Sequence, residues 1–127
     1  MTLPTSPLHL RLRMDPDERL AAAVGGVARF FADNAGLANE LILELQSSVL
    51  SVCRHCFGLH VSATPCDVAF HRLADRIEME VFLPIEEAPA DKGHLAWPGV
   101  DEVHCETRGA SAVLCLTKFV SPSPDAE

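Results

Sequence analysis

Positive charge is scarce in this sequence: the 127 residues include ten lysines and arginines against eighteen aspartates and glutamates, for a net charge of −8. Only Lys92 and Lys118 are lysines, and the arginines are scattered along the chain. Nucleic-acid backbones and anionic membrane surfaces are bound through clusters of lysine and arginine side chains. We therefore expect neither nucleic acid nor a membrane as a partner.

Long hydrophobic runs and export signals are also missing. The longest apolar run, Leu20 to Ala28, contains two glycines and is far shorter than the roughly 20 residues that cross a bilayer. The first seven residues hold two prolines and no basic segment followed by an apolar one, so no secretory signal is predicted. The five cysteines are odd in number and follow no disulfide framework. These absences predict a cytoplasmic protein with reduced thiols.

The residues that are present follow periods typical of strands and helices. Leu8, Leu10, Leu12 and Met14 alternate with polar residues and predict a strand with one buried face. Helices are predicted over residues 16–35, where Asp15 is the expected cap, and over residues 39–56. The second helix has an apolar stripe that consists of Ile42, Leu45, Val49, Val52 and Cys56, with Gly58 just past its end.

Downstream, the period changes to two. Residues 68–70 and 77–83 predict two strands joined by a turn near Ala74 and Asp75, and residues 103–107 and 113–119 predict a hairpin that turns at residues 108–110. Residues 84–99 hold three prolines and predict a loop. Because strands are grouped after helices, we expect an α+β two-layer sandwich with a mixed, mostly antiparallel sheet and helices on one face.

Length and composition also predict the domain organisation of the chain. Residues 1–7 are expected to be a loose arm, residues 8–120 one domain, and residues 121–127 a tail that is disordered by composition.

Two segments carry a resemblance to a known family. Residues 41–57 form a long helix that ends in Arg54-His55-Cys56-Phe57, and residues 100–118 form a closing hairpin that begins Val100-Asp-Glu-Val. In this order and spacing the chain resembles the GHKL (histidine-kinase-like ATPase) superfamily, in particular its small anti-sigma-factor serine-kinase branch, over residues 8–120. The resemblance implies a Bergerat-like fold, a role in bacterial transcription regulation, and a sigma factor or anti-sigma antagonist as partner. It also implies homodimers, with residues 8–14 and 16–35 as the dimer or partner surface.

The sequence departs from that branch at the positions on which the branch's chemistry depends. Aligned on Arg54 and His55, the helix offers Ser47 and Ser51 where the branch has a catalytic glutamate and a metal-coordinating asparagine. A neutral hydroxyl replaces neither a carboxylate base nor an amide ligand of Mg²⁺. Residues 84–90 contain no adenine-reading aspartate and no glycine, and the glycine-rich phosphate lid is reduced to residues 91–99.

We therefore expect a regulatory, protein-binding domain of the anti-sigma type without a bound cofactor and without kinase activity. A vestigial pocket would consist of Ser47, Ser51, His55, Glu86 and Gly93. The acidic chain would suit a basic partner through electrostatic steering. An active serine kinase that uses ATP and Mg²⁺ in an atypical pocket stays open as an alternative, because Glu86 or Asp91 could substitute by a shifted route.

Cys53 and Cys56 form a C-x-x-C motif. With His60 or Cys66 it would make part of a zinc site, and alone it would make a redox pair, so a small metal-binding or redox module is a further alternative. No second C-x-x-C exists in the sequence, and both cysteines fall on the apolar side of the predicted helix. That position favours a core role over metal binding, because a thiol there packs as a small hydrophobe.

Two other groups carry candidate chemistry. His71 and His104 could meet across strands, although isolated surface histidines are the simpler interpretation. Cys105, His104 and Glu106 are excluded as a nucleophilic triad, because neighbours on one strand point to opposite faces. Trp97 lies in the predicted loop and either fills the vacated nucleotide cavity or anchors a partner.

Overall fold

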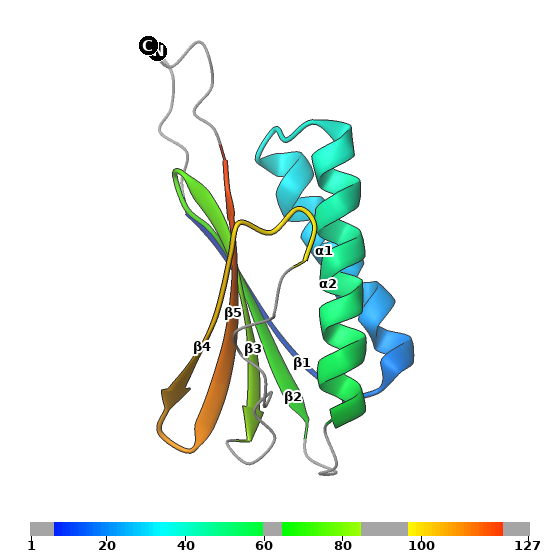
Figure 1. Cartoon of the computed structure of the whole chain (residues 1–127), viewed down its shortest axis with the longest axis vertical. Coiled ribbons are helices and arrows are strands. Elements are labelled where there is room, and N and C mark those ends of the chain that lie inside the picture. Colours follow the sequence, from blue (N-terminus) through cyan, green and yellow to red (C-terminus); the bar gives the residue numbers. More distant parts are fainter. Residues whose placement is uncertain (1–6, 60–64, 85–96, 121–127) are drawn as a thin grey trace.

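The computed structural model describes residues 7–59, 65–84 and 97–120 and arranges them as a sheet covered on one face by two helices (Figure 1). The elements, in chain order, are β1 (Leu8–Met14), the 3-10 helix η1 (Glu18–Leu20), α1 (Ala21–Asn34), α2 (Asn39–Leu59), β2 (Cys66–Arg72), β3 (Arg76–Pro84), β4 (Glu102–Arg108) and β5 (Ser111–Phe119). The expected α+β two-layer sandwich is confirmed. Neither α-helix in this part of the chain has the length and apolarity to cross a membrane.

The strands lie in the order β1-β2-β3-β5-β4, and every pairing among them is antiparallel. The expectation of a mixed sheet is thus wrong, since β2 with β3 and β4 with β5 form hairpins and the remaining pairs also run antiparallel. The hairpin turn between β4 and β5 contains Gly109 at φ +60°, a left-handed conformation that favours glycine.

Both helices are where their periods predict them, but their ends differ. The expected cap at Asp15 is wrong: Asp17 caps the 3-10 turn η1, where its carboxylate accepts the Arg19 backbone N–H, and α1 follows from Ala21. Hydrogen bonds from Arg19 also lower the pKa of Asp17 to about 2. The second helix continues through Gly58 to Leu59, three residues beyond its predicted end.

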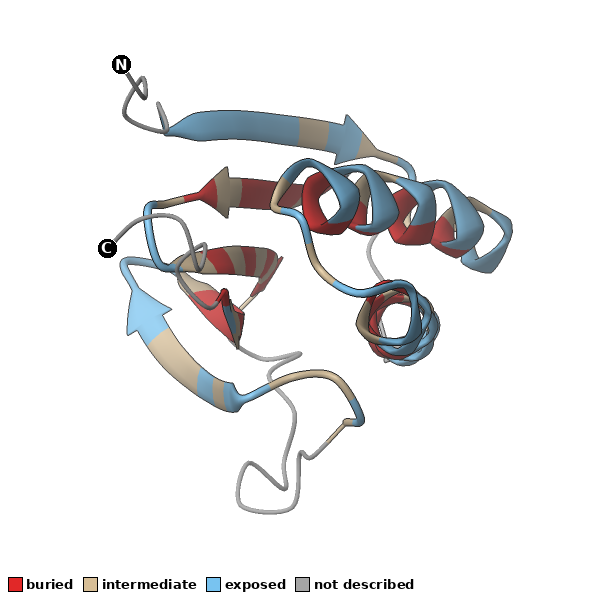
Figure 2. Ribbon diagram, turned by 90° about the horizontal axis from the view of Figure 1, so that it is seen from above, coloured by how far each residue is buried: buried red, intermediate tan, exposed pale blue. Residues whose placement is uncertain are grey.

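The core lies between the helices and the inner face of the sheet, where buried residues face one another (Figure 2). Leu45 and Val49 of α2 are buried there, and Phe31 of α1 stacks on Phe70 of β2 at 5.4 Å between ring centroids. The predicted apolar stripe of α2 is confirmed, since all five of its members are buried.

The first strand departs from its expected burial. Leu8 and Leu10 point to the inner side of the sheet but are 38% and 39% exposed, while Leu12 and Met14 are only half-buried. The reason is position: β1 is an edge strand that pairs with β2 alone. One side of this strand therefore combines exposed apolar side chains with an open backbone edge.

Replacing Leu45 with alanine tests how α2 packs against the sheet. Because Leu45 is 5% exposed in the core, Leu45→Ala should lower the free energy of unfolding by about 2–5 kcal/mol, measured by urea denaturation. The matched control is Leu43→Ala on the same helix, where the side chain is 48% exposed and the expected change is within about 0.5 kcal/mol. Equal losses in the two variants would show that the buried stripe is misassigned.

Candidate functional site

The vestigial pocket predicted from the sequence centres on one stripe of α2. Ser47, Ser51 and His55 follow one another at intervals of four residues, which places them along one side of the helix, and all three are exposed. Glu86 and Gly93, the other two members of that pocket, lie outside the described residues. The exposed stripe therefore carries two hydroxyls and an imidazole, and neither serine supplies a carboxylate or an amide oxygen.

Among the described residues, the neighbouring Ser48 makes a tertiary contact through its hydroxyl. Ser48 is 3% exposed, and its hydroxyl donates a hydrogen bond to the backbone carbonyl of Pro98. Sequence reasoning missed this residue, although the helical period gives a signal: Ser48 falls between Leu45 and Val52 on the buried stripe.

The turn at residues 97–100 rests directly on α2. Gly99 has φ +79°, and a Cβ there would lie 2.9 Å from Glu44 Cβ and 2.9 Å from the Leu45 backbone nitrogen. A Cβ atom does not fit at 2.9 Å from these atoms. The turn can therefore approach the helix this closely only because residue 99 is glycine. Trp97 of the same turn is half-buried and packs against the core cluster. Its two predicted roles, as the filler of a nucleotide cavity or as an anchor for a partner, stay predictions.

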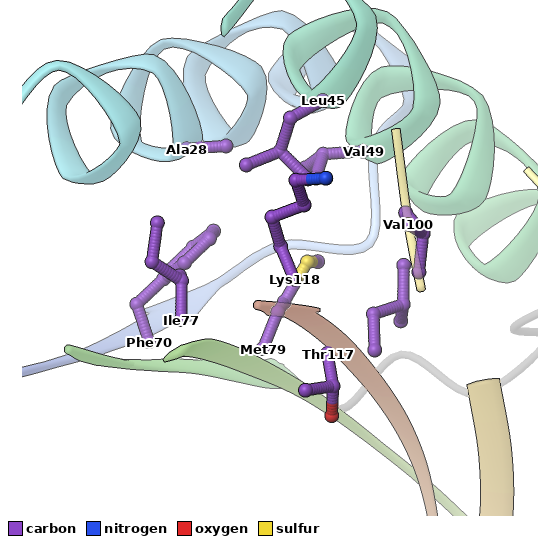
Figure 3. A pocket seen from close by; sticks show the side chains of 10 residues that line it. Ala28, Leu45, Val49, Phe70, Ile77, Met79, Val100, Thr117 and Lys118 are labelled. Atoms are coloured by element: carbon purple, nitrogen blue, oxygen red, sulfur yellow. The ribbon is translucent and has the colours of Figure 1, made fainter. Parts of the chain in front are cut away.

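Between α2 and the sheet, the described residues leave an apolar cavity of about 10 Å³, with room for about one water molecule (Figure 3). Leu45 and Val49 line it from the helix, and Phe70 and Met79 line it from the sheet. Lys118 enters from β5 with its side chain 12% exposed, and its Nζ lies 3.4 Å from Asp101 Oδ2. This half-buried ion pair links Asp101, directly before β4, to Lys118 near the end of β5.

Cys53 and Cys56 are fully buried in the core. Burial raises the pKa of the Cys53 thiol far above its ordinary range and that of Cys56 to about 12. Cys66 is also buried, and its Sγ donates to the Phe82 carbonyl at 3.5 Å; His60 lies outside the described residues. Because the thiolate is the form that binds metals and attacks disulfides, the core position opposes both kinds of chemistry at neutral pH.

The helices leave the outer face of the sheet uncovered (Figure 2). A row of polar contacts runs along this face from β1 to β4. His9 Nδ1 and His71 Nδ1 are 2.8 Å apart, and His71 Nε2 lies 2.7 Å from Glu80 Oε1. Arg108 continues the row, with Nη1 at 2.5 Å from Glu80 Oε2 and Nη2 bonded to Glu106. Partial burial raises the pKa of Glu80, but hydrogen bonds from His71 and Arg108 outweigh this effect and hold it below its ordinary value.

The row shows that the preferred interpretation of His71 as an isolated surface histidine is wrong, and that His71 does not meet His104 either. His71 meets His9 because β1 is the neighbour of β2, whereas β3 and β5 separate β2 from β4. The exclusion of the Cys105 triad is confirmed, since Cys105 lies on the side of β4 that packs against the core, opposite to His104 and Glu106. Cys115 of β5, and not Cys105, is the cysteine that lies beside His104 and Glu106.

Comparison with known proteins gives a structural match but no sequence match. No family model and no curated protein matches the chain. Among solved structures, the chain is similar to the crystal structure of the RsbU and RsbW domains of Rv1364c from Mycobacterium tuberculosis, with a TM-score of 0.65 and 18% sequence identity. The match covers 94% of this chain and 34% of that one, so the chain spans about a third of its structural neighbour. At this identity the match shows a shared fold.

Replacing Gly99 with alanine tests the close approach of the turn to α2. Gly99→Ala should lower the free energy of unfolding by more than about 1 kcal/mol, because the positive φ is unfavourable for alanine and its Cβ meets the α2 backbone. Trp97, the sole tryptophan, should report a displaced turn through its fluorescence. In the control Gly26→Ala, nothing lies within 4 Å of the new Cβ, and the helix should gain about 0.5–1 kcal/mol. A neutral Gly99→Ala would contradict the packing of this turn.

Proposed function

We propose that this chain is a regulatory domain of the anti-sigma-factor type, which acts by binding a protein partner and does not bind ATP. The fold shared with the structure of the RsbU and RsbW domains supports the architecture. The partner class, a sigma factor or an antagonist of an anti-sigma factor, comes from the resemblance of residues 41–57 and 100–118 to the small serine-kinase branch. The proposal places the domain in the cytoplasm.

The observation that carries the loss of ATP binding is the exposed stripe of α2. At the two positions where the branch has a glutamate and an asparagine, the helix presents the hydroxyls of Ser47 and Ser51. A serine hydroxyl does not act as a base near neutral pH, and it is a poorer ligand for Mg²⁺ than an amide or carboxylate oxygen.

The turn at residues 97–100 lies directly on the neighbouring side of α2. The Ser48 hydroxyl donates a hydrogen bond to the Pro98 carbonyl, and a Cβ at Gly99 would lie 2.9 Å from Glu44 Cβ and from the Leu45 backbone nitrogen. A turn packed this closely leaves no room for a ligand between itself and that part of the helix, which supports the same proposal.

A partner surface is available on β1. Of the large hydrophobic side chains exposed in the described part of the chain, Leu8 and Leu10 belong to β1 and Phe30 to α1. Exposed apolar side chains next to an unpaired strand edge are typical of surfaces that bind another chain. We propose this surface, made of Leu8, Leu10 and the outer edge of β1, as the contact with the partner or with a second copy.

Mg-ATP titration tests the nucleotide half of the proposal. A ligand at about a hundred times its Kd would raise the melting temperature of a domain of this size by about 5 °C. We expect millimolar Mg-ATP or Mg-ADP to produce no such shift. Ser51→Asn alone should also give none, since residues 84–90 still contain no adenine-reading aspartate and the glycine-rich phosphate lid is still reduced. A saturable shift in the unmodified protein would instead support the active kinase.

Partner binding tests the other half. Titration calorimetry with the sigma factors encoded in the same genome should find one that binds, and Leu10→Arg should weaken that binding by about tenfold or more. Leu43→Arg is the matched control, because Leu43 is an exposed leucine on α2 and its replacement should leave the affinity unchanged. If no sigma factor or anti-sigma antagonist binds, the partner class is wrong; equal effects of the two variants would refute the β1 surface.

A further inference from the structure

The β4–β5 hairpin brings three metal-ligating side chains together on the outer face of the sheet. His104 on β4 is paired directly with Cys115 on β5, and Glu106 lies two residues farther along β4, on the same face. One ligand atom from each of the three, an imidazole nitrogen, a thiol sulfur and a carboxylate oxygen, lies within 4.8 Å of the other two. Among the described residues this is the one such group.

The spacing of these atoms is close to that of a tetrahedral metal site. A zinc ion bound at about 2.3 Å from sulfur and 2.0 Å from oxygen holds those two atoms about 3.5 Å apart. Cys115 Sγ and Glu106 Oε1 are 3.7 Å apart. Small rotations of the side chains would bring the three ligand atoms to metal-binding distances without movement of the strands.

The surroundings suit a divalent cation. In the metal-free form the Cys115 thiol donates to the Glu106 carboxylate. Burial and the Glu106 and Glu80 carboxylates raise the pKa of the Cys115 thiol to about 12, so the metal must displace its proton, which passes to solvent. Cys53 and Cys56 are 0% exposed in the core, whereas Cys115 lies beside the exposed His104, where an ion can arrive. The negative charges of the thiolate and of the Glu106 carboxylate then balance the two positive charges of the ion. The positive charge of the neighbouring Arg108 is balanced by Glu80, whose Oε2 lies 2.5 Å from Arg108 Nη1. Arg108 also bonds Glu106 and so holds that carboxylate in place, as outer-shell partners of metal ligands do.

Access and rigidity are both provided by the hairpin. Cys115 is 7% exposed and lies at the base of the group, whereas His104 is exposed and open to an approaching ion. The ligands project from two paired strands, so the backbone that holds them is ordered before any metal arrives. Only the exposed imidazole and the partly exposed carboxylate need to adjust.

From this geometry we propose that His104, Glu106 and Cys115 form a binding site for a zinc-type divalent transition metal, with a water molecule as the fourth ligand. The mixture of sulfur, nitrogen and oxygen ligands selects zinc-type ions over Mg²⁺ and Ca²⁺, which prefer oxygen alone. The site is separate from Cys53 and Cys56, which are buried in the core on the other side of the sheet. It is also independent of the nucleotide and partner-binding properties proposed above.

Cobalt and zinc titrations of the reduced full chain test the site. Co²⁺ should produce the sulfur-to-cobalt charge-transfer absorption that only a thiolate ligand gives, and excess Zn²⁺ should raise the melting temperature by about 5 °C, whereas Mg²⁺ should not. Cys115→Ser should abolish the absorption, and His104→Ala should weaken Zn²⁺ binding by about tenfold or more. Because His104 is exposed, His104→Ala should leave the fold intact, as circular dichroism would verify.

Two control variants separate this site from the other cysteines and histidines. Cys105→Ser changes the neighbouring thiol on the opposite face of β4, and His71→Ala removes the histidine that contacts His9. Both should retain the cobalt absorption and the affinity for Zn²⁺. The proposal is overturned if the unmodified protein shows no thiolate absorption, if the absorption survives Cys115→Ser, or if His71→Ala weakens Zn²⁺ binding while His104→Ala does not.

Discussion

Burial of one stripe of α2 against the inner face of the sheet is the constraint on which the rest of the structure depends. Leu45 and Val49 meet side chains of β2, β3 and β5, and α1 closes the same core from beside them. The helical period then assigns neighbouring residues to different environments. Ser48 becomes a buried anchor for the turn at residues 97–100, whereas Ser47 remains in solvent. Both the exposed stripe and the small cavity lined by Leu45 and Val49 on the buried side of the helix follow from this single orientation.

Local periodicity was sufficient to predict most of the fold. The alternation in residues 77–83 and 113–119, and the stripe from Ile42 to Cys56, reflect burial on one side of an element, which a sequence records directly. The burial of β1 was predicted wrongly for the same reason. Alternation in Leu8 to Met14 shows that one side is apolar, but it does not show whether anything covers that side. Whether another element covers that side depends on the order of the strands in the sheet, and the period of the sequence gives no information about this order.

The candidate sites were harder to predict, because they depend on strand register. Cys115 and His104 are opposite each other because β4 and β5 pair in one particular alignment, and His9 meets His71 because β1 returns beside β2. A shift of one residue would send each side chain to the other face of the sheet. Cys105 is next to His104 in the sequence and could have been taken as its partner in a site. Neighbours on one strand point to opposite faces of the sheet, so the two side chains do not meet. The resemblance assigned Ser47 and Ser51 to a vestigial pocket on one side of the helix, an assignment that stays a prediction, and it carried no information on the outer face of the sheet.

The edge position of β1 also bears on how the chain folds. The hairpins β2–β3 and β4–β5 join residues that are near in sequence, so their formation closes only short loops. The contact between His9 and His71 spans 62 residues, and β1 can pair only after the chain has passed through both helices. Long closures of this kind form late, and weakly covered segments open most readily. We therefore expect the first strand to dock late and to exchange its amide hydrogens before the hairpins and α2 do. Opening of β1 would expose the edge of β2, which is the edge that the same strand of a second chain could fill.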